Sequence, residues 1–308
     1  MKCVVIINPK SGKGFTKNNE IRIKKILSEY NYESKIIYTK KRGHATRIIK
    51  KLNDDIDLVI SMGGDGTFSE VMNGNLQREK ALVLSHLPIG TLNDIGHMYG
   101  LINNLYTNLK LILTGKVMNI DVGLINKHAF TYVASYGKFM EIPYETPQEL
   151  KKRLGWFAYA VEVLKQIFQR IPKYPIEFSV DGEKHQGRYT FIIISNANHI
   201  AGINNFYRDM KLDDSKIEVM LCSLYKKLDI IKAFYNLKTN NLQGVSGIEI
   251  YKCSEFKVKF LEKAKPWCVD GEKFQDNTKT YKFEILKNIK MQLPKKNLKK
   301  LFIKYKEN

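Results

Sequence analysis

Residues 56–73 read IDLVISMGGDGTFSEVMN, a glycine-rich loop between an apolar run and a helix-forming one. The apolar run predicts a buried parallel strand. The residues that follow predict a helix that opens with a Thr67 cap and an early glutamate, Glu70. Glycines at such a turn let the backbone approach a ligand, and the helix N-terminus favours an anion, most often a phosphate.

Asp65 lies inside this loop, where its charge would repel a phosphate. The carboxylate has a role if a cation such as Mg²⁺ bridges it to the anion. Residues 63–67 alone, GGDGT, leave open the alternative of a glycine-rich turn that binds no ligand.

The first 120 residues alternate between strand and helix patterns. Apolar runs cover residues 3–7, 35–38, 56–61 and 82–87, with amphipathic stretches such as 17–30 and 44–53 between them. This alternation predicts an N-terminal, nucleotide-binding α/β domain (1–120), open and with a mostly parallel sheet.

The remaining chain predicts a β-rich antiparallel domain over residues 121–286, with one helix near 150–170. Its strand-like segments cover residues 129–135, 174–180, 188–195, 216–224, 255–261 and 278–286. We expect the segment 287–308 to pack back on the first domain. Its apolar residues Leu298, Leu301, Phe302 and Tyr305 share a helical face among lysines, which suits either that docking or an interfacial membrane anchor.

Composition restricts the class of protein. The chain has 308 residues, 44% of them hydrophobic, and no apolar run reaches the length of a membrane span. The first residues predict a strand rather than a signal peptide, and four scattered cysteines fit a reducing cytoplasm. A net charge of +20 favours an anionic partner, but only eight of the 51 basic residues are arginine, which argues against a nucleic-acid reader.

Two further loops resemble the first in their small, polar character. They are NPKSGKG at residues 8–14 and PIGTLND at residues 88–94, each directly after a predicted strand. In a parallel sheet such loops emerge at one carboxyl edge, where ligands bind. None of the three loops matches the P-loop or the dinucleotide-binding pattern, so neither of those phosphate-binding motifs is present in them.

In this order and spacing, NPKSGKG, GGDGT and PIGTLND resemble the diacylglycerol kinase catalytic family, in particular the bacterial soluble lipid kinases. Sphingosine and ceramide kinases share that catalytic domain, and NAD kinases share the GGDGT-type loop. The resemblance continues at residues 119–123, 152–159, 211–216 and 269–272.

The resemblance implies that ATP binds between the two domains. The implied ATP-binding residues are Asn8, Lys13, Thr39, Gly63, Gly64, Asp65, Gly66, Thr67, Ser69, Gly90, Thr91 and Asn93. Lys13 would offer its ammonium to a phosphate.

The resemblance also implies two magnesium ions. Asp65 would hold the catalytic Mg²⁺, with Asp94 and Asp214 linked to it through water and metal. A structural Mg²⁺ would bind the Asp214 carboxylate and backbone oxygens of Lys211 and Lys216. Without the resemblance, an acidic turn is the simpler interpretation of residues 213–214.

A carboxylate near the acceptor hydroxyl would take its proton. The resemblance assigns this role to Glu272, with Asp270 beside it. The same sequence, VDGEK, occurs at residues 180–184 and 269–273, and Asp-Gly between strands predicts a hairpin turn in either copy. Spacing alone does not choose between Glu183 and Glu272; the resemblance selects the later copy.

Three positions depart from the family pattern: Leu92, where Gly or Ala is usual, His97, near which a basic residue is common, and Ser215, where glycine is common. None of them removes a charged residue or a predicted ligand.

These observations predict a Mg²⁺- and ATP-dependent kinase that phosphorylates diacylglycerol to phosphatidic acid, as a cytoplasmic protein peripherally bound to an anionic membrane. Other acceptors remain alternatives, namely a sphingoid base, another glycerolipid or NAD. A nucleotide-binding protein without turnover is a further alternative, and a nucleic-acid binder rests on charge alone. The sequence leaves a homodimer open.

Overall fold

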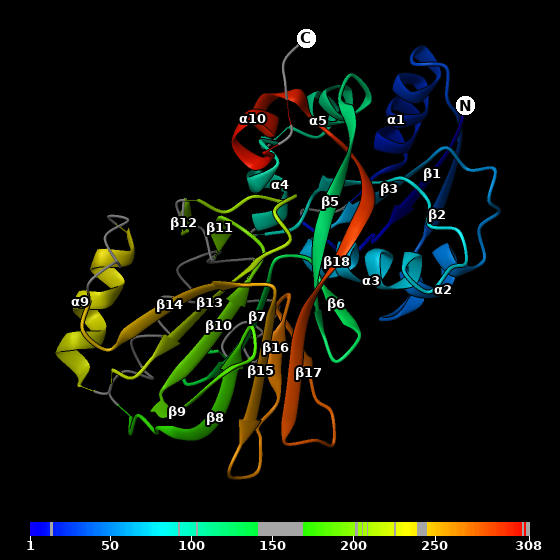
Figure 1. Cartoon of the computed structure of the whole chain (residues 1–308). Coiled ribbons are helices and arrows are strands. Elements are labelled where there is room, and N and C mark those ends of the chain that lie inside the picture. The colour runs from blue at the N-terminus through cyan, green and yellow to red at the C-terminus, as the bar shows by residue number, and fades with distance from the viewer. Residues whose placement is uncertain are drawn as a thin grey trace. The chain divides into compact units, whose positions relative to one another are not determined.

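The computed structural model describes residues 1–12, 15–91, 93–102, 104–140, 169–200, 203–204, 206–207, 209–224, 226–238, 245–303 and 305 (Figure 1). The chain divides into two units. Unit 1 comprises Met1–Asp121 and Lys287–Asn308, and unit 2 comprises Val122–Leu286. Strands β5 (Lys116–Ile125) and β18 (Thr280–Leu293) pair with each other and run from one unit into the other.

Unit 1 is built on a parallel sheet. Its strands are β1 (Lys2–Ile7), β2 (Glu33–Tyr38), β3 (Leu58–Gly63) and β4 (Leu84–Pro88), in the order β2-β1-β3-β4. The C-terminal end of β18 adds to β4, also parallel, at Met291 and Leu84. The predicted open α/β fold is confirmed.

Helices bury both faces of this sheet. Cys3, Val5 and Ile7 of β1 pack with α1 (Lys17–Glu29) and α5 (Leu105–Leu113), while the alternate residues Val4 and Ile6 are equally buried on the opposite side. The other helices of unit 1 are α2 (His44–Lys50), α3 (Asp65–Asn75), α4 (Asp94–Met98), the 3₁₀ turn η1 (Lys295–Asn297) and α10 (Leu298–Leu301). Strands covered on both faces explain the continuous apolar runs in the sequence.

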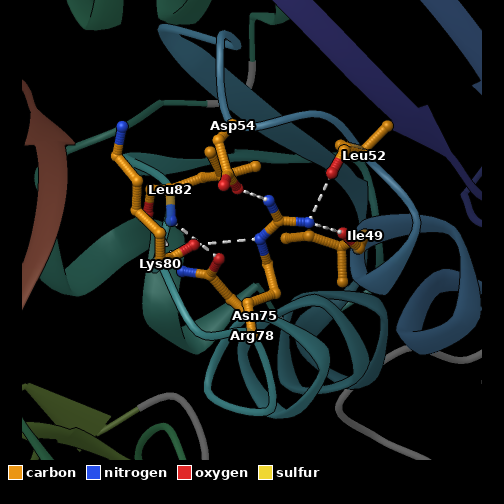
Figure 2. A network of polar contacts seen from close by, with 7 residues as sticks. All are labelled: Ile49, Leu52, Asp54, Asn75, Arg78, Lys80 and Leu82. Atoms are coloured by element: carbon orange, nitrogen blue, oxygen red, sulfur yellow. Dashed lines mark hydrogen bonds and ion pairs between the residues drawn. The ribbon is translucent and has the colours of Figure 1, made fainter.

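Arg78 joins the ends of α2 and α3 (Figure 2). Its side chain is 5% exposed and forms an ion pair with Asp54. Its Nη1 donates to the carbonyls of Ile49 and Leu52, both at 2.7 Å, and its Nε donates to the carbonyl of Lys80 at 3.1 Å. One guanidinium therefore satisfies carbonyl groups from the end of α2 and from the turn after α3.

Unit 2 is β-rich and antiparallel, as predicted. One sheet has the order β14-β13-β10-β7-β16-β17, formed by Ile248–Cys253, Ile217–Cys222, Phe191–Ser195, Val133–Gly137, Trp267–Val269 and Glu272–Phe274. The other holds β15 (Glu255–Phe260), β8 (Tyr174–Val180), β9 (Glu183–Tyr189), β6 (His128–Phe130) and parts of β5 and β18. Buried aromatic side chains, among them Tyr136, Trp267 and Phe283, form the core between these strands. The short pair β11 (His199–Ile200) and β12 (Ile203–Asn204) and helix α9 (Lys227–Lys238) complete the described elements.

Several expectations need correction. Helix α3 begins at Asp65 with Gly64 as its N-cap, so Thr67 is not the cap. The predicted strand 129–135 is interrupted after Phe130, because the N–H groups of Thr131 and Tyr132 donate to Asp270 instead of a neighbouring strand. The segment 188–195 is divided at Thr190 into β9 and β10. The predicted helix near 150–170 lies outside the described residues, except for 169–170, which are not helical.

Candidate active site

The three predicted loops meet at the carboxyl edge of the unit 1 sheet. They follow β1, β3 and β4, which are parallel neighbours. Gly12 has φ +65°, and a Cβ there would lie 2.0 Å from the carbonyl oxygen of Ile89. A Cβ on Gly90 would lie 2.7 Å from Cα of Gly64. The glycines are therefore required where the loops touch, and not only where they could approach a ligand.

Asn8 and Thr67 connect the first loop to the second. The Asn8 amide donates to Oγ1 of Thr67 at 3.2 Å, and its backbone N–H donates to the carbonyl of Met62 at 2.9 Å. A Cβ on Gly63 would lie 2.4 Å from the same Oγ1. This packing holds Thr67 in the first turn of α3, beside the helix N-terminus.

Asp65 connects the second loop to the third. Its carboxylate accepts the backbone N–H of Asp94 at 3.2 Å and that of Ile95 at 3.3 Å. Asp65 is partly buried and Asp94 is buried. A carboxylate with a fixed orientation therefore lies in the loop where the sequence predicts both the phosphate and the metal.

Asn93 shapes the third loop. It adopts φ +54° as the N-cap of α4, and its amide donates to the carbonyl of Gly90 at 3.0 Å. Its Oδ1 is buried and has no hydrogen-bond partner among the described residues. Thr91 is exposed, while Leu92 lies outside the described residues, as do Lys13 and Gly14.

The remaining predicted ATP residues surround these loops. Thr39 follows β2 and donates its N–H to the carbonyl of Ile7 at 2.8 Å, Ser69 is buried in α3, and Gly66 lies in the first turn of that helix. Glu70 has a role that the sequence did not reveal. Its carboxylate accepts the N–H groups of Gly43 at 2.6 Å and Ala45 at 3.1 Å, which fastens the loop after β2 to α3.

In unit 2, both VDGEK copies form the same two-residue hairpin turn. Asp181 and Gly182 have φ of 46° and 93°, and Asp270 and Gly271 have φ of 48° and 82°. Positive φ at both central residues is what a type I′ turn requires. The hairpin interpretation is therefore correct for both copies, and local conformation does not distinguish them.

Their surroundings do distinguish them. Asp270 is 3% exposed, and both its oxygens accept backbone N–H groups: Oδ2 from Thr131 at 2.7 Å, Oδ1 from Tyr132 at 3.1 Å and Val133 at 3.2 Å. The Thr131 hydroxyl adds a bond at 2.8 Å. Burial raises the pKa of Asp270, and these donors oppose that rise. Asp270 thus acts as a clamp that holds residues 131–133 through these hydrogen bonds.

Glu272 and Glu183 are both exposed at the start of the second strand of their hairpin. Glu183 is 79% exposed in its side chain and lies 3.7 Å from Nε2 of His185. The geometry of each turn alone leaves the choice between them open.

Asp214 lies in the loop before β13, between the partly buried residues Lys211 and Lys216. Its Oδ1 accepts the N–H of Lys216 at 3.0 Å, and its Oδ2 lies 2.7 Å from Nζ of Lys252. Ser215 has φ +60°, in the left-handed region that glycine adopts most readily. Lys252 gave no signal in the sequence, because its partners lie more than thirty residues away.

Within the part of the chain that the structure describes, no group of three or more His, Cys, Asp or Glu side chains is arranged to hold a metal ion. Within the same residues, no helix combines the length and the hydrophobicity needed to cross a membrane.

Comparison with known proteins gives consistent relatives. The model of the diacylglycerol kinase catalytic domain matches residues 2–125. Diacylglycerol kinases of Staphylococcus saprophyticus and Staphylococcus aureus are each 31% identical over 220 residues, which cover 70% of this chain and 71% and 69% of theirs. The crystal structure of a Bacillus anthracis protein provisionally assigned as a diacylglycerol kinase superposes with a TM-score of 0.80 at 25% identity, covering 95% of this chain and 96% of that one.

Proposed function

Since the chain belongs to the diacylglycerol kinase family, and is therefore a lipid kinase that uses ATP, we propose that its acceptor is the free hydroxyl of diacylglycerol and its product phosphatidic acid. The acceptor is proposed from the diacylglycerol kinase relatives, and the observation that supports ATP-dependent transfer is the contact of three glycine loops at one sheet edge, with the Asp65 carboxylate held between two of them. Such an edge suits the phosphates of ATP, because backbone N–H groups and the N-terminus of α3 attract negative charge.

Asp65 suits the catalytic Mg²⁺. Magnesium in phosphoryl-transfer enzymes is bound by one or two carboxylates together with substrate phosphates. Asp65 offers a carboxylate held by two backbone donors, and Asp94 is its neighbour. When bound, Mg²⁺ would neutralise charge on the transferring phosphoryl group.

Glu272 is the proposed general base, which takes the proton of the acceptor hydroxyl. It is exposed, whereas both oxygens of Asp270 are occupied by backbone donors. Asp270 then serves as a positioning residue that holds residues 131–133 against β16 and β17. Peripheral binding to an anionic membrane is part of the proposal, supported by the net charge of +20.

The test is transfer of label from γ-labelled ATP, with Mg²⁺, to mixed micelles that contain diacylglycerol, with sphingosine and NAD as parallel acceptors. We expect label in phosphatidic acid, and a loss of about 10²-fold or more in Asp65→Asn, with the fold of that variant checked by circular dichroism. Label in another acceptor alone would show that the protein is a kinase but that diacylglycerol is not its substrate. Turnover unchanged in Asp65→Asn would refute the metal role.

The two hairpins provide a matched pair of variants that tests which glutamate is the general base. Glu272→Gln should slow transfer by about 10²-fold or more, because a positioned base contributes that much. Glu183→Gln, the same change in the same turn, should leave the rate within about twofold. The reverse result would mean that the base belongs to the other copy.

A further inference from the structure

The ammonium of Lys252 lies among acidic groups of unit 2. It is 2.7 Å from Oδ2 of Asp214 and 3.6 Å from Oε1 of Glu218, and it donates to the carbonyl of Asp209 at 2.8 Å. The Asp214 and Glu218 side chains are only 9% and 4% exposed. One positive charge thus faces two carboxylates that are largely removed from water.

The sheet places these groups together. Glu218 in β13 and Lys252 in β14 are direct cross-strand partners, and Asp214 lies in the loop that enters β13. Neither oxygen of Glu218 has a hydrogen-bond partner among the described residues. Among the described residues, the ammonium of Lys252 is a positive charge that faces this carboxylate, at 3.6 Å.

The family resemblance predicts a structural Mg²⁺ at this loop, with the Asp214 carboxylate as a ligand. The groups present do not suit it. Nζ of Lys252 already lies 2.7 Å from Oδ2 of Asp214, as an ion pair without hydrogen-bond geometry, and Oδ1 accepts the N–H of Lys216 at 3.0 Å. A divalent ion at this carboxylate would stand beside a positive charge in a poorly solvated place, where repulsion is strong.

We propose that Lys252 is a built-in cation, which in this chain takes the place of a divalent ion at the loop 211–216. A tethered ammonium offsets part of the negative charge of Asp214 and Glu218 at any metal concentration, so the loop keeps its conformation without metal. Removal of the ammonium leaves two facing carboxylates, which is the arrangement that binds a divalent ion through hard oxygen ligands.

The test uses full-length protein without ATP or lipid, so that its result is independent of the kinase reaction. Thermal unfolding is measured with and without Mn²⁺ or Ca²⁺ at constant ionic strength. Any shift of the unfolding midpoint that metal causes in wild type should be equally large in Asp214→Asn. Lys252→Met should lower the midpoint by roughly 5 °C or more, since it leaves buried charge unpaired, and millimolar Mn²⁺ should restore at least half of that loss.

Two variants serve as controls. Lys259→Met removes an exposed cross-strand pair with Glu177, and its midpoint should fall by no more than about 2 °C, with no recovery in metal. The double variant Lys252→Met/Asp214→Asn should lose the recovery in Mn²⁺, because one of the two carboxylates is gone.

Direct binding decides the question even if Lys252→Met does not fold. Mn²⁺ bound per chain is counted by electron paramagnetic resonance in wild type and in Asp214→Asn. Equal counts support the proposal. One fewer ion in Asp214→Asn would overturn it, and so would a Lys252→Met variant that is as stable as wild type.

Discussion

Asp181 and Asp270 show how far identical sequence determines a residue's role. Both follow a valine, precede Gly-Glu-Lys and adopt positive φ in a two-residue hairpin. Asp181 lies at the surface, where Oδ1 accepts the N–H groups of both Ser254 and Glu255 and Oδ2 pairs with the ammonium of Lys216 at 3.4 Å. Asp270 is buried, and backbone N–H groups donate to both of its oxygens. The burial arises from residues 131–133, nearly 140 positions away, so no local pattern could reveal it.

The first prediction compares these two aspartates. Asp270→Asn should lower the free energy of unfolding by about 2–3 kcal/mol, because its amide NH₂ would face backbone donors that need an acceptor. Asp181→Asn should cost less than about 1 kcal/mol, since the amide oxygen can still accept both N–H groups and only the exposed pair with Lys216 is lost. Urea unfolding of each variant measures the difference. Equal losses would contradict the clamp role of Asp270.

Elements that the sequence predicted correctly are those buried on one or both faces. The apolar runs at 3–7 and 56–61 became β1 and β3, and the amphipathic stretch 17–30 became α1. Strand β14 was not predicted because its apolar residues do not alternate cleanly with polar ones: Ile250 is exposed like Lys252, whereas Glu249 is partly buried. The site loops were predictable because parallel strands place them at one edge, whereas the contacts between the loops depend on tertiary packing.

The second prediction concerns the junction of α2 and α3 (Figure 2). Arg78→Lys should destabilise the protein by about 3 kcal/mol, because an ammonium cannot reach the carbonyls of Ile49, Leu52 and Lys80 together while pairing with Asp54. Lys24→Met, which breaks the exposed helical pair with Glu20, is the control and should show no measurable loss. An equally mild effect of Arg78→Lys in chemical unfolding would mean that the network contributes little.

At the scale of the whole molecule, unit 1 is assembled from both ends of the chain. Beyond the β18–β4 pairing, Oγ of Ser85 donates to the carbonyl of Gln292 at 2.8 Å, and the Gln292 amide donates to the carbonyl of Ile112 at 3.0 Å. Asn297 donates to the carbonyl of Met98 at 3.0 Å. Leu298, Leu301 and Phe302 are buried, so these three side chains pack within unit 1, whereas Ile303 is exposed.

In this segment, we expect the buried leucine to affect stability and the exposed lysines to affect vesicle binding. Leu301→Ala should lower the free energy of unfolding by about 2–4 kcal/mol, as buried leucines do, and should leave binding to anionic vesicles unchanged below its melting temperature. Lys295, Lys296 and Lys299 are exposed, and replacing all three by alanine should keep stability and weaken vesicle binding, at about 1 kcal/mol per lysine near the surface. Cosedimentation with vesicles of defined phosphatidylserine content, beside thermal unfolding, measures both. Loss of vesicle binding in Leu301→Ala at unchanged stability would show that the apolar face contacts lipid. A leucine packed within unit 1 can change vesicle binding only if its substitution unfolds that unit.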